Sequence, residues 1–217
     1  MVRFNVFSAA VLAMTAASAA SAQTVVARLD GISPSRVLSM TTDGWDHDRD
    51  VRTGVNNFTV IDSPVLLTGQ FNAFCIDVHQ TIQLEHTYTY TVTPIELAPL
   101  PGDGMGQAKA DLLRELWGRH YFDSLLSNTN GSAFQAAVWE IINDPGLNLN
   151  FGSFQMSGSE TTIDRAQDWL DELNGDHAYF APVYALTSGE TQDMLVPTPG
   201  SAALLGIGGL AMLRRRR

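Results

Sequence analysis

Residues 86–122 read HTYTYTVTPIELAPLPGDGMGQAKADLLRELWGRHYF, and this segment contains the change of pattern that decides the fold. In residues 86–94, threonines alternate with two tyrosines and a valine, which is typical of a half-buried strand, and Pro94 ends it. A loop rich in glycine and proline follows over residues 97–106. From residue 107 to 122, apolar side chains recur at the spacing of an amphipathic helix. The chain therefore passes here from sheet to helices.

The rest of the chain extends this order on both sides. Residues 24–92 show mostly period-two patterning, which predicts strands. Beyond the first helix, the sequence predicts a polar stretch at residues 127–132 and a second helix at 133–144. A loop at 147–158 and a third helix at 159–175 follow. Two closing strands are expected at 177–189 and 193–196. We expect one compact α+β unit, with a β-rich sandwich or barrel-like body and a helical lobe of about three helices.

Both ends of the chain are expected to be processing segments. Residues 1–22 hold Arg3, an apolar run and small residues ending at Ala22, which predicts a secretory signal peptide. The alternative, a short buried helix, lacks a polar pattern on one face. The C-terminal residues 196–217 hold two prolines, an apolar stretch shorter than a spanning helix needs, and four arginines. The folded domain would then be residues 23–195.

The C-terminal segment, VPTPGSAALLGIGGLAMLRRRR, resembles the PEP-CTERM sorting signal of Gram-negative bacteria, which an exosortase cleaves in the inner membrane. Thr198 stands where that motif usually has glutamate, so the resemblance rests on the layout and on the VPxPG variant. It implies export by the secretion machinery, a transient tether to the inner membrane, and final placement at the cell surface or in the extracellular matrix. A weak membrane anchor that stays in place is the alternative.

The net charge of the expected domain is strongly negative. Five of the 13 basic residues lie in the two end segments, which contain no acidic residue; this leaves 8 basic against 23 acidic residues, a net charge of −15. Such a surface disfavours nucleic acid and anionic lipid as partners.

The only cysteine of the chain is Cys75, within NAFCIDVHQ at residues 72–80. Strand alternation would place Cys75 on the same face as Asp77 and His79, so that an imidazole could assist loss of the thiol proton. Three readings follow: a packed structural cysteine, a cysteine nucleophile with His79 or His120 as its base, or a covalent crosslink to a side chain other than cysteine.

A candidate partner for the crosslink is Gln135, within SAFQAAVWEIIN at residues 132–143. The alanines after it allow close approach of another backbone, and Trp139 lies on the same side of the helix, where it could cover the glutamine. An alternative is a helix capping box formed by Ser132 and Gln135.

Together, FCID and FQAAVW resemble the two signature motifs of bacterial thioester domains. The resemblance implies that Cys75 is the thiol partner and Gln135 the acyl partner of an internal thioester. Asp77 and His79 are the candidate acid and base, because they would share the strand face of Cys75. It implies an exported surface or matrix protein that attaches covalently to amine- or hydroxyl-bearing partners. Such a protein is not an enzyme beyond a single-turnover, autocatalytic crosslinker. A noncovalent matrix protein with a packed cysteine is the alternative function, and a hydrolase or transglutaminase-like enzyme is a third.

No metal site or cofactor is expected from the motifs. The acidic stretch DGWDHDRD, residues 43–50, has the alternating aspartates of calcium loops, but Val51 and Asn57 stand where such a loop needs glycine and glutamate. We therefore interpret it as a solvated turn. The five histidines are scattered, which disfavours zinc.

Overall fold

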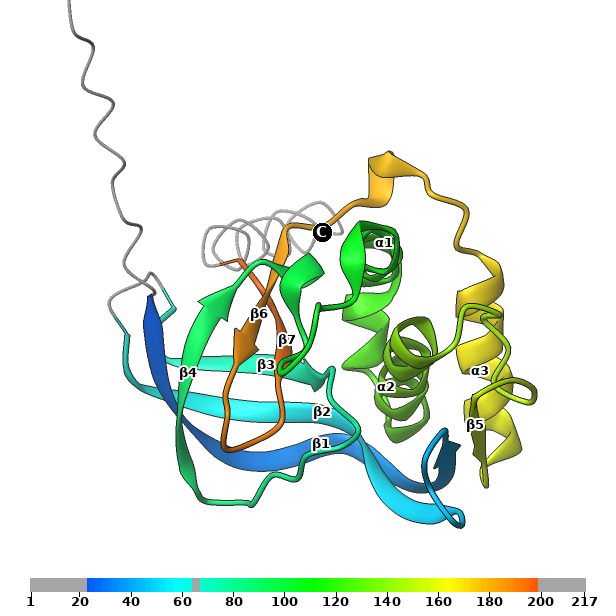
Figure 1. The fold of residues 1–217 in the computed structure, drawn as a ribbon, viewed down its shortest axis with the longest axis horizontal. Coiled ribbons are helices and arrows are strands. Elements are labelled where there is room, and N and C mark those ends of the chain that lie inside the picture. The colour runs from blue at the N-terminus through cyan, green and yellow to red at the C-terminus, as the bar shows by residue number, and fades with distance from the viewer. Residues whose placement is uncertain (1–22, 64–66, 199–217) are drawn as a thin grey trace, which may run out of the picture.

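The computed structural model describes residues 23–63 and 67–198 (Figure 1). The expected signal peptide, residues 1–22, and residues 199–217 of the expected sorting signal lie outside the described residues.

The described chain confirms the α+β class, with a body of strands and a lobe of three α-helices. The elements follow one another as β1 (Thr24–Thr42), β2 (Arg49–Asp62), β3 (Gln70–Cys75), β4 (Thr87–Thr93), η1 (Ile95–Leu97), α1 (Gly106–Ser124), α2 (Asn128–Asn143), β5 (Phe154–Ser157), α3 (Glu160–Asp171), η2 (His177–Tyr179), β6 (Val183–Thr187) and β7 (Met194–Pro197). The helices lie to one side of the strands (Figure 1). Among the described residues, no helix has the length and apolar character needed to span a membrane.

The sheet closes on itself. Its strand order is β2-β3-β7-β6-β4-β1-β5, and β1 also pairs with β2, so six strands form a closed ring and β5 extends it from β1. Every pairing is antiparallel. Closure satisfies the strand edges within the molecule and leaves a barrel-like body. The alternating side chains of Val25, Ala27 and Leu29 are fully buried inside it.

A bend in β1 brings the sheet and the helical lobe together. The register between β1 and β2 shifts around Pro34. Two glycines from other elements lie against the Pro34 carbonyl oxygen. A Cβ atom at Gly54 of β2 would lie 2.3 Å from this oxygen, and one at Gly131 of α2 would lie 2.6 Å from it. Only residues without a side chain fit at these distances, so the two glycines set how closely α2 approaches the barrel.

The second helix is the centre of the lobe. α2 packs between α1 and α3 and against β1 and β2 (Figure 1). Every residue from Gly131 to Ile142 is buried, so this helix has no solvent face there. The rings of Phe134 on α2, Phe74 on β3 and Trp117 on α1 form a cluster, with centroids 4.3 to 5.8 Å apart. This cluster joins the end of β3 to the middle of α2.

The predicted start of the second helix was wrong. The polar stretch at residues 127–132 was expected to precede the helix, but α2 begins at Asn128. Ser127 is the N-cap, and its side chain accepts a hydrogen bond from the Asn130 N–H. Ser132 is therefore not a cap: its hydroxyl donates to the carbonyl of Thr53 on β2. The capping-box reading of Ser132 and Gln135 is thereby excluded.

Three further boundaries differ from the expectation. The expected loop at residues 147–158 contains β5, which pairs with the end of β1. The third helix ends at Asp171, short of the expected Gly175, whose N–H instead donates to Glu115 on α1. The last strand continues into the expected sorting segment, because Val196 and Pro197 pair with β6. Each difference arises from a partner distant in the sequence.

Candidate functional site

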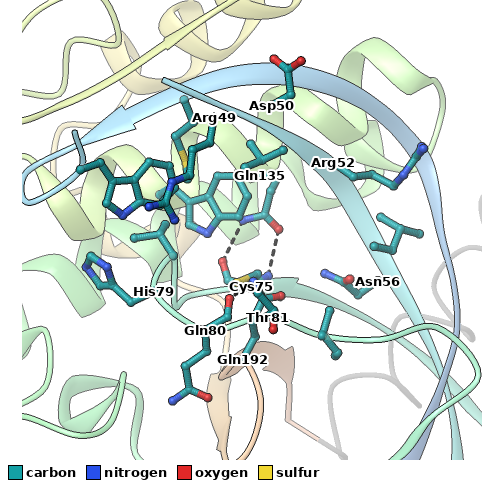
Figure 2. A pocket seen from close by; sticks show the side chains of 17 residues that line it. Arg49, Asp50, Arg52, Asn56, Cys75, His79, Gln80, Thr81, Gln135 and Gln192 are labelled. Carbon is teal, nitrogen blue, oxygen red and sulfur yellow. Dashed lines mark hydrogen bonds between the residues drawn. The ribbon is translucent and has the colours of Figure 1, made fainter. Parts of the chain in front are cut away.

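Cys75 and Gln135 meet where β3 ends against α2. The Gln135 side-chain Oε1 accepts a hydrogen bond from the Cys75 N–H at 2.9 Å, and its Nε2 donates to the Cys75 carbonyl at 2.8 Å (Figure 2). Both residues are almost fully buried, at 2% and 1% exposure. Two residues 60 positions apart are thus held together by a reciprocal pair of hydrogen bonds, away from bulk water.

The Cys75 sulfur makes its own contacts with the main chain of Asp77. The thiol donates to the Asp77 carbonyl at 3.0 Å, and the Asp77 N–H donates back to the sulfur at 3.3 Å. Burial raises the pKa of the thiol to about 12, and the carboxylates of Asp77 and Asp193 add to the rise. The Asp77 N–H, which donates to the sulfur, favours the thiolate without reversing the shift of this pKa. The free thiol is therefore protonated at neutral pH.

The expected shared face of Cys75, Asp77 and His79 is not present. β3 ends at Cys75, so strand alternation stops there. Asp77 is buried and stays beside the sulfur, but its carboxylate accepts the His79 N–H at 2.8 Å. The His79 side chain is exposed and lies at the edge of the site (Figure 2). The structure thus brings Asp77 close to Cys75 and leaves His79 at the solvent boundary.

His120, the other candidate base, lies elsewhere. It sits on α1, where its ring stacks on Trp169 at 4.8 Å between centroids, and its Nε2 lies 3.2 Å from Glu172. Burial lowers its pKa. Because His120 belongs to the contact between α1 and α3, it is not part of the Cys75 site.

Asp193 is a residue of the site that sequence reasoning missed. It is fully buried just before β7, and its carboxylate accepts the N–H groups of Leu100 and Ser188, both at 2.7 Å. Burial raises its pKa to about 6, and the nearby Asp77 carboxylate adds to the rise. Asp193 precedes Met194, which pairs with Cys75, and its carboxylate is near enough to raise the pKa of the thiol. Sequence reasoning could not find Asp193, because no local sequence pattern predicts this long-range strand pairing.

A pocket of about 300 Å³ opens onto the pair (Figure 2). Cys75, Gln135 and Trp139 line it together with residues of β1, β2 and the segment after β3. The Trp139 indole N–H is buried and has no hydrogen-bond partner in the described chain. Trp139 lines the pocket together with Gln135, and the prediction that its ring covers the glutamine stays a prediction. The pocket gives a small group a route to two otherwise buried residues.

The acidic turn, residues 43–50, contributes Trp45, Arg49 and Asp50 to the lining of this pocket. Asp43, Asp46, Asp48 and Asp50 are all exposed, and the Thr41 hydroxyl donates to Asp48. Within residues 23–63 and 67–198, no group of three or more histidine, cysteine or acidic side chains is arranged to hold a metal ion.

The arrangement suits acyl chemistry at the Gln135 carbonyl. The Cys75 N–H already donates to Oε1, the oxygen that would carry negative charge after attack on the amide carbon. The leaving nitrogen is held on the Cys75 carbonyl. Comparisons with family models, with curated proteins and with solved structures found no significant match to this chain.

Proposed function

We propose that this protein is an exported surface or matrix protein in which Cys75 and Gln135 form an internal thioester that attaches the chain covalently to an outside partner. The observation that carries the proposal is the buried reciprocal pair of hydrogen bonds between the Gln135 amide and the Cys75 main chain, at the floor of an open pocket.

Formation of the thioester needs no outside reagent. The Cys75 sulfur attacks the Gln135 amide carbon, the carbon–nitrogen bond breaks, and the nitrogen leaves as ammonia with the thiol proton. Holding the two groups in place can lower such a barrier by roughly 7–11 kcal/mol. Asp77 is the candidate proton carrier through its buried carboxylate, since its main-chain carbonyl holds the thiol and so keeps the residue beside the sulfur. His79 is the candidate for exchange of protons with solvent.

Attachment to the partner reverses thioester formation, except that a nucleophile of the partner takes the place of ammonia. An amine or hydroxyl of the partner attacks the Gln135 carbonyl carbon, the carbon–sulfur bond breaks, and the nucleophile's proton goes to the Cys75 sulfur. The product is an amide or ester, and the chain reacts once. Export by the secretion machinery, sorting by an exosortase with a transient inner-membrane tether, and final placement at the surface of a Gram-negative cell complete the proposal.

Methylamine tests the acyl role of Gln135. The full chain is incubated with methylamine, digested and mapped by mass spectrometry. The proposal predicts a methylamide on Gln135 and a new free thiol on Cys75, and no methylamide in Cys75→Ser. Gln80 and Gln192, which line the same pocket, serve as internal controls and should stay unmodified. Equal labelling of these glutamines, or labelling that persists in Cys75→Ser, would sink the proposal.

A noncovalent matrix protein is the second candidate. It is favoured by the fact that every polar atom of the Gln135 amide and of the Cys75 backbone already has a partner without a covalent bond. In that case Gln135 is a structural brace between β3 and α2, and methylamine leaves it unchanged.

A further inference from the structure

We propose that the pocket above Cys75 and Gln135 binds an acidic polysaccharide and presents one of its hydroxyls to the Gln135 carbonyl. The binding part of this inference stands on the pocket alone; the covalent part rests on the proposed thioester.

The first observation is an amide that has no hydrogen-bond partner within the described chain. Asn56 on β2 is only 4% exposed and lines the pocket, yet its side chain makes no hydrogen bond within the described chain. Figure 2 shows the Asn56 amide pointing toward Cys75. The Asn56 amide atoms are not sealed from solvent, so they face the water of the pocket, and a ligand that supplies hydrogen-bond partners can replace that water. The amide both donates and accepts, as a hydroxyl does.

The second observation is the charge of the pocket. Its charged lining residues are Arg49, Arg52 and Asp50, a net charge of +1 on a domain of net charge −15. Neither arginine makes an ion pair within the described residues, in contrast to Arg28, Arg114 and Arg119. The Arg49 guanidinium lies 4.2 Å above the centre of the Trp45 ring. The Asp50 carboxylate and the Arg52 guanidinium, which donates to the Ser35 hydroxyl, both point away from Cys75 (Figure 2). The positive charge of the pocket therefore rests on Arg49.

These two observations favour an anionic ligand whose nucleophile is neutral. A lysine ammonium would meet Arg49 at the mouth, and like charges repel. A carboxylate is instead attracted and can pair with the guanidinium in two hydrogen bonds.

A uronic-acid polymer carries a carboxylate and several hydroxyls on every residue, so a carboxylate can pair with Arg49 while a hydroxyl of the same polymer reaches Asn56. An acidic peptide has a hydroxyl only at occasional positions. The amides of Gln80 and Gln192 at the same wall add further partners for hydroxyls.

The covalent step follows from this placement. The sugar hydroxyl oxygen attacks the Gln135 carbonyl carbon of the thioester, the carbon–sulfur bond breaks, and the hydroxyl proton passes to the Cys75 sulfur. The product is an ester between the chain and the polysaccharide, with Cys75 returned to a thiol.

Binding is tested on the full chain carrying Cys75→Ala, which cannot form a thioester. The probes are tetragalacturonate, the neutral maltotetraose and a cationic chitosan tetramer, titrated by calorimetry at about 0.15 M salt, where charges outside the pocket are screened beyond about 8 Å. We expect tetragalacturonate to bind at least tenfold more tightly than the other two. Arg49→Gln should weaken it by about tenfold, the loss of one charge-assisted pair. Arg165→Gln is the matched control, because Arg165 also lies over a tryptophan, Trp169, but on α3.

Four results would overturn the inference: equal binding of the neutral tetramer, tighter binding of the chitosan tetramer, an unchanged affinity in Arg49→Gln, or a tetraglutamate peptide that binds as tightly as tetragalacturonate. Asn56→Asp, which places a negative charge beside the sugar at nearly constant shape, should abolish binding while the melting temperature reports on its folding. Because Cys75→Ala is used, failure of the thioester leaves this test intact, and failure to bind says nothing against the thioester.

Discussion

Gln135 is held by the main chain of the residue whose sulfur would attack it. Both hydrogen bonds of its amide go to Cys75, so rotation of the glutamine side chain is restricted before any reaction. The thiol is held separately by Asp77. The two reacting groups are therefore positioned by different hydrogen bonds.

The buried thiol has a consequence for chemical labelling. With a pKa of about 12 and 2% exposure, a free Cys75 reacts slowly with alkylating reagents while the chain is folded. We expect Gln135→Ala to contain one thiol that is alkylated only after unfolding, and the wild type to contain none under either condition. The measurement is mass spectrometry after iodoacetamide treatment in denaturant. Gln192→Ala, a change at another pocket glutamine, should behave as wild type; a thiol in wild type equal to that of Gln135→Ala contradicts the account.

Sequence reasoning reached Cys75 and Gln135 because each lies in a short local motif. Asn56 and Asp193 could not be found this way, because they reach the site through the pairing of β3 with β2 and with β7. The prediction for His79 failed for a different reason: strand alternation was extended beyond Cys75, where the strand ends.

At the scale of elements, α2 carries the site and its stability controls the position of Gln135. Ser127 caps its first turn. The sequence did not predict this cap, because the polar composition of residues 127–132 is also typical of a loop. The sheet-to-helix change at residues 86–122 was predictable because both of its patterns are long and regular. β5 was not, because its four residues gain their partner only from the distant end of β1.

Loss of this cap should destabilise the domain. Ser127→Ala leaves the Asn130 N–H without its acceptor, and we expect the free energy of unfolding to fall by about 1 kcal/mol. Ser159→Ala is the comparison, since Ser159 is the N-cap of α3 but its side chain accepts no backbone N–H and is bonded only to the hydroxyls of Thr161 and Thr162. Urea denaturation followed by circular dichroism measures both. An equal effect at the two caps would refute the role assigned to Ser127.

A buried carboxyl on α2 makes stability depend on pH. Glu140 is fully buried, one of its oxygens accepts the Asn148 N–H, and the other has no partner in the described chain. Burial raises its pKa to about 7 from the usual 4.5. Between these two values the folded chain keeps a proton that the unfolded chain has lost. The free energy of unfolding should therefore fall as pH rises through this window, by up to about 1.4 kcal/mol per unit.

Replacement of Glu140 tests this dependence. Glu140→Gln keeps an acceptor for Asn148 and removes the ionisation, so the variant should be more stable than wild type at pH 8 by about 1–3 kcal/mol. At pH 5 the two should differ little. Glu190→Gln, at an exposed glutamate between β6 and β7, is the control. Parallel stability curves for wild type and Glu140→Gln from pH 5 to 8 would contradict the buried-acid assignment.

At the scale of the whole molecule, a thioester would join the closed barrel to the helical lobe. The bond would close a loop of 60 residues between β3 and α2. By the chain-entropy argument used for disulfides, such a link stabilises the folded state by about 4 kcal/mol. It would hold the domain together under load from a covalently attached polymer.

Opening the thioester should therefore lower stability. Methylamine converts the bond to a methylamide and a thiol, and we expect the free energy of unfolding of the opened chain to fall by about 4 kcal/mol. Guanidinium denaturation of treated and untreated wild type measures the difference. The Cys75→Ala chain, treated in the same way, should not change; a shift in that variant would show that methylamine acts elsewhere.

The most direct measurement is the intact mass of the purified full chain in denaturant, beside a Cys75→Ser chain prepared in the same way, so that any processing of the ends cancels. The account predicts that the wild type is lighter than its own sequence by one ammonia, and that the serine variant has its full mass. A wild-type mass with no ammonia missing would contradict the account.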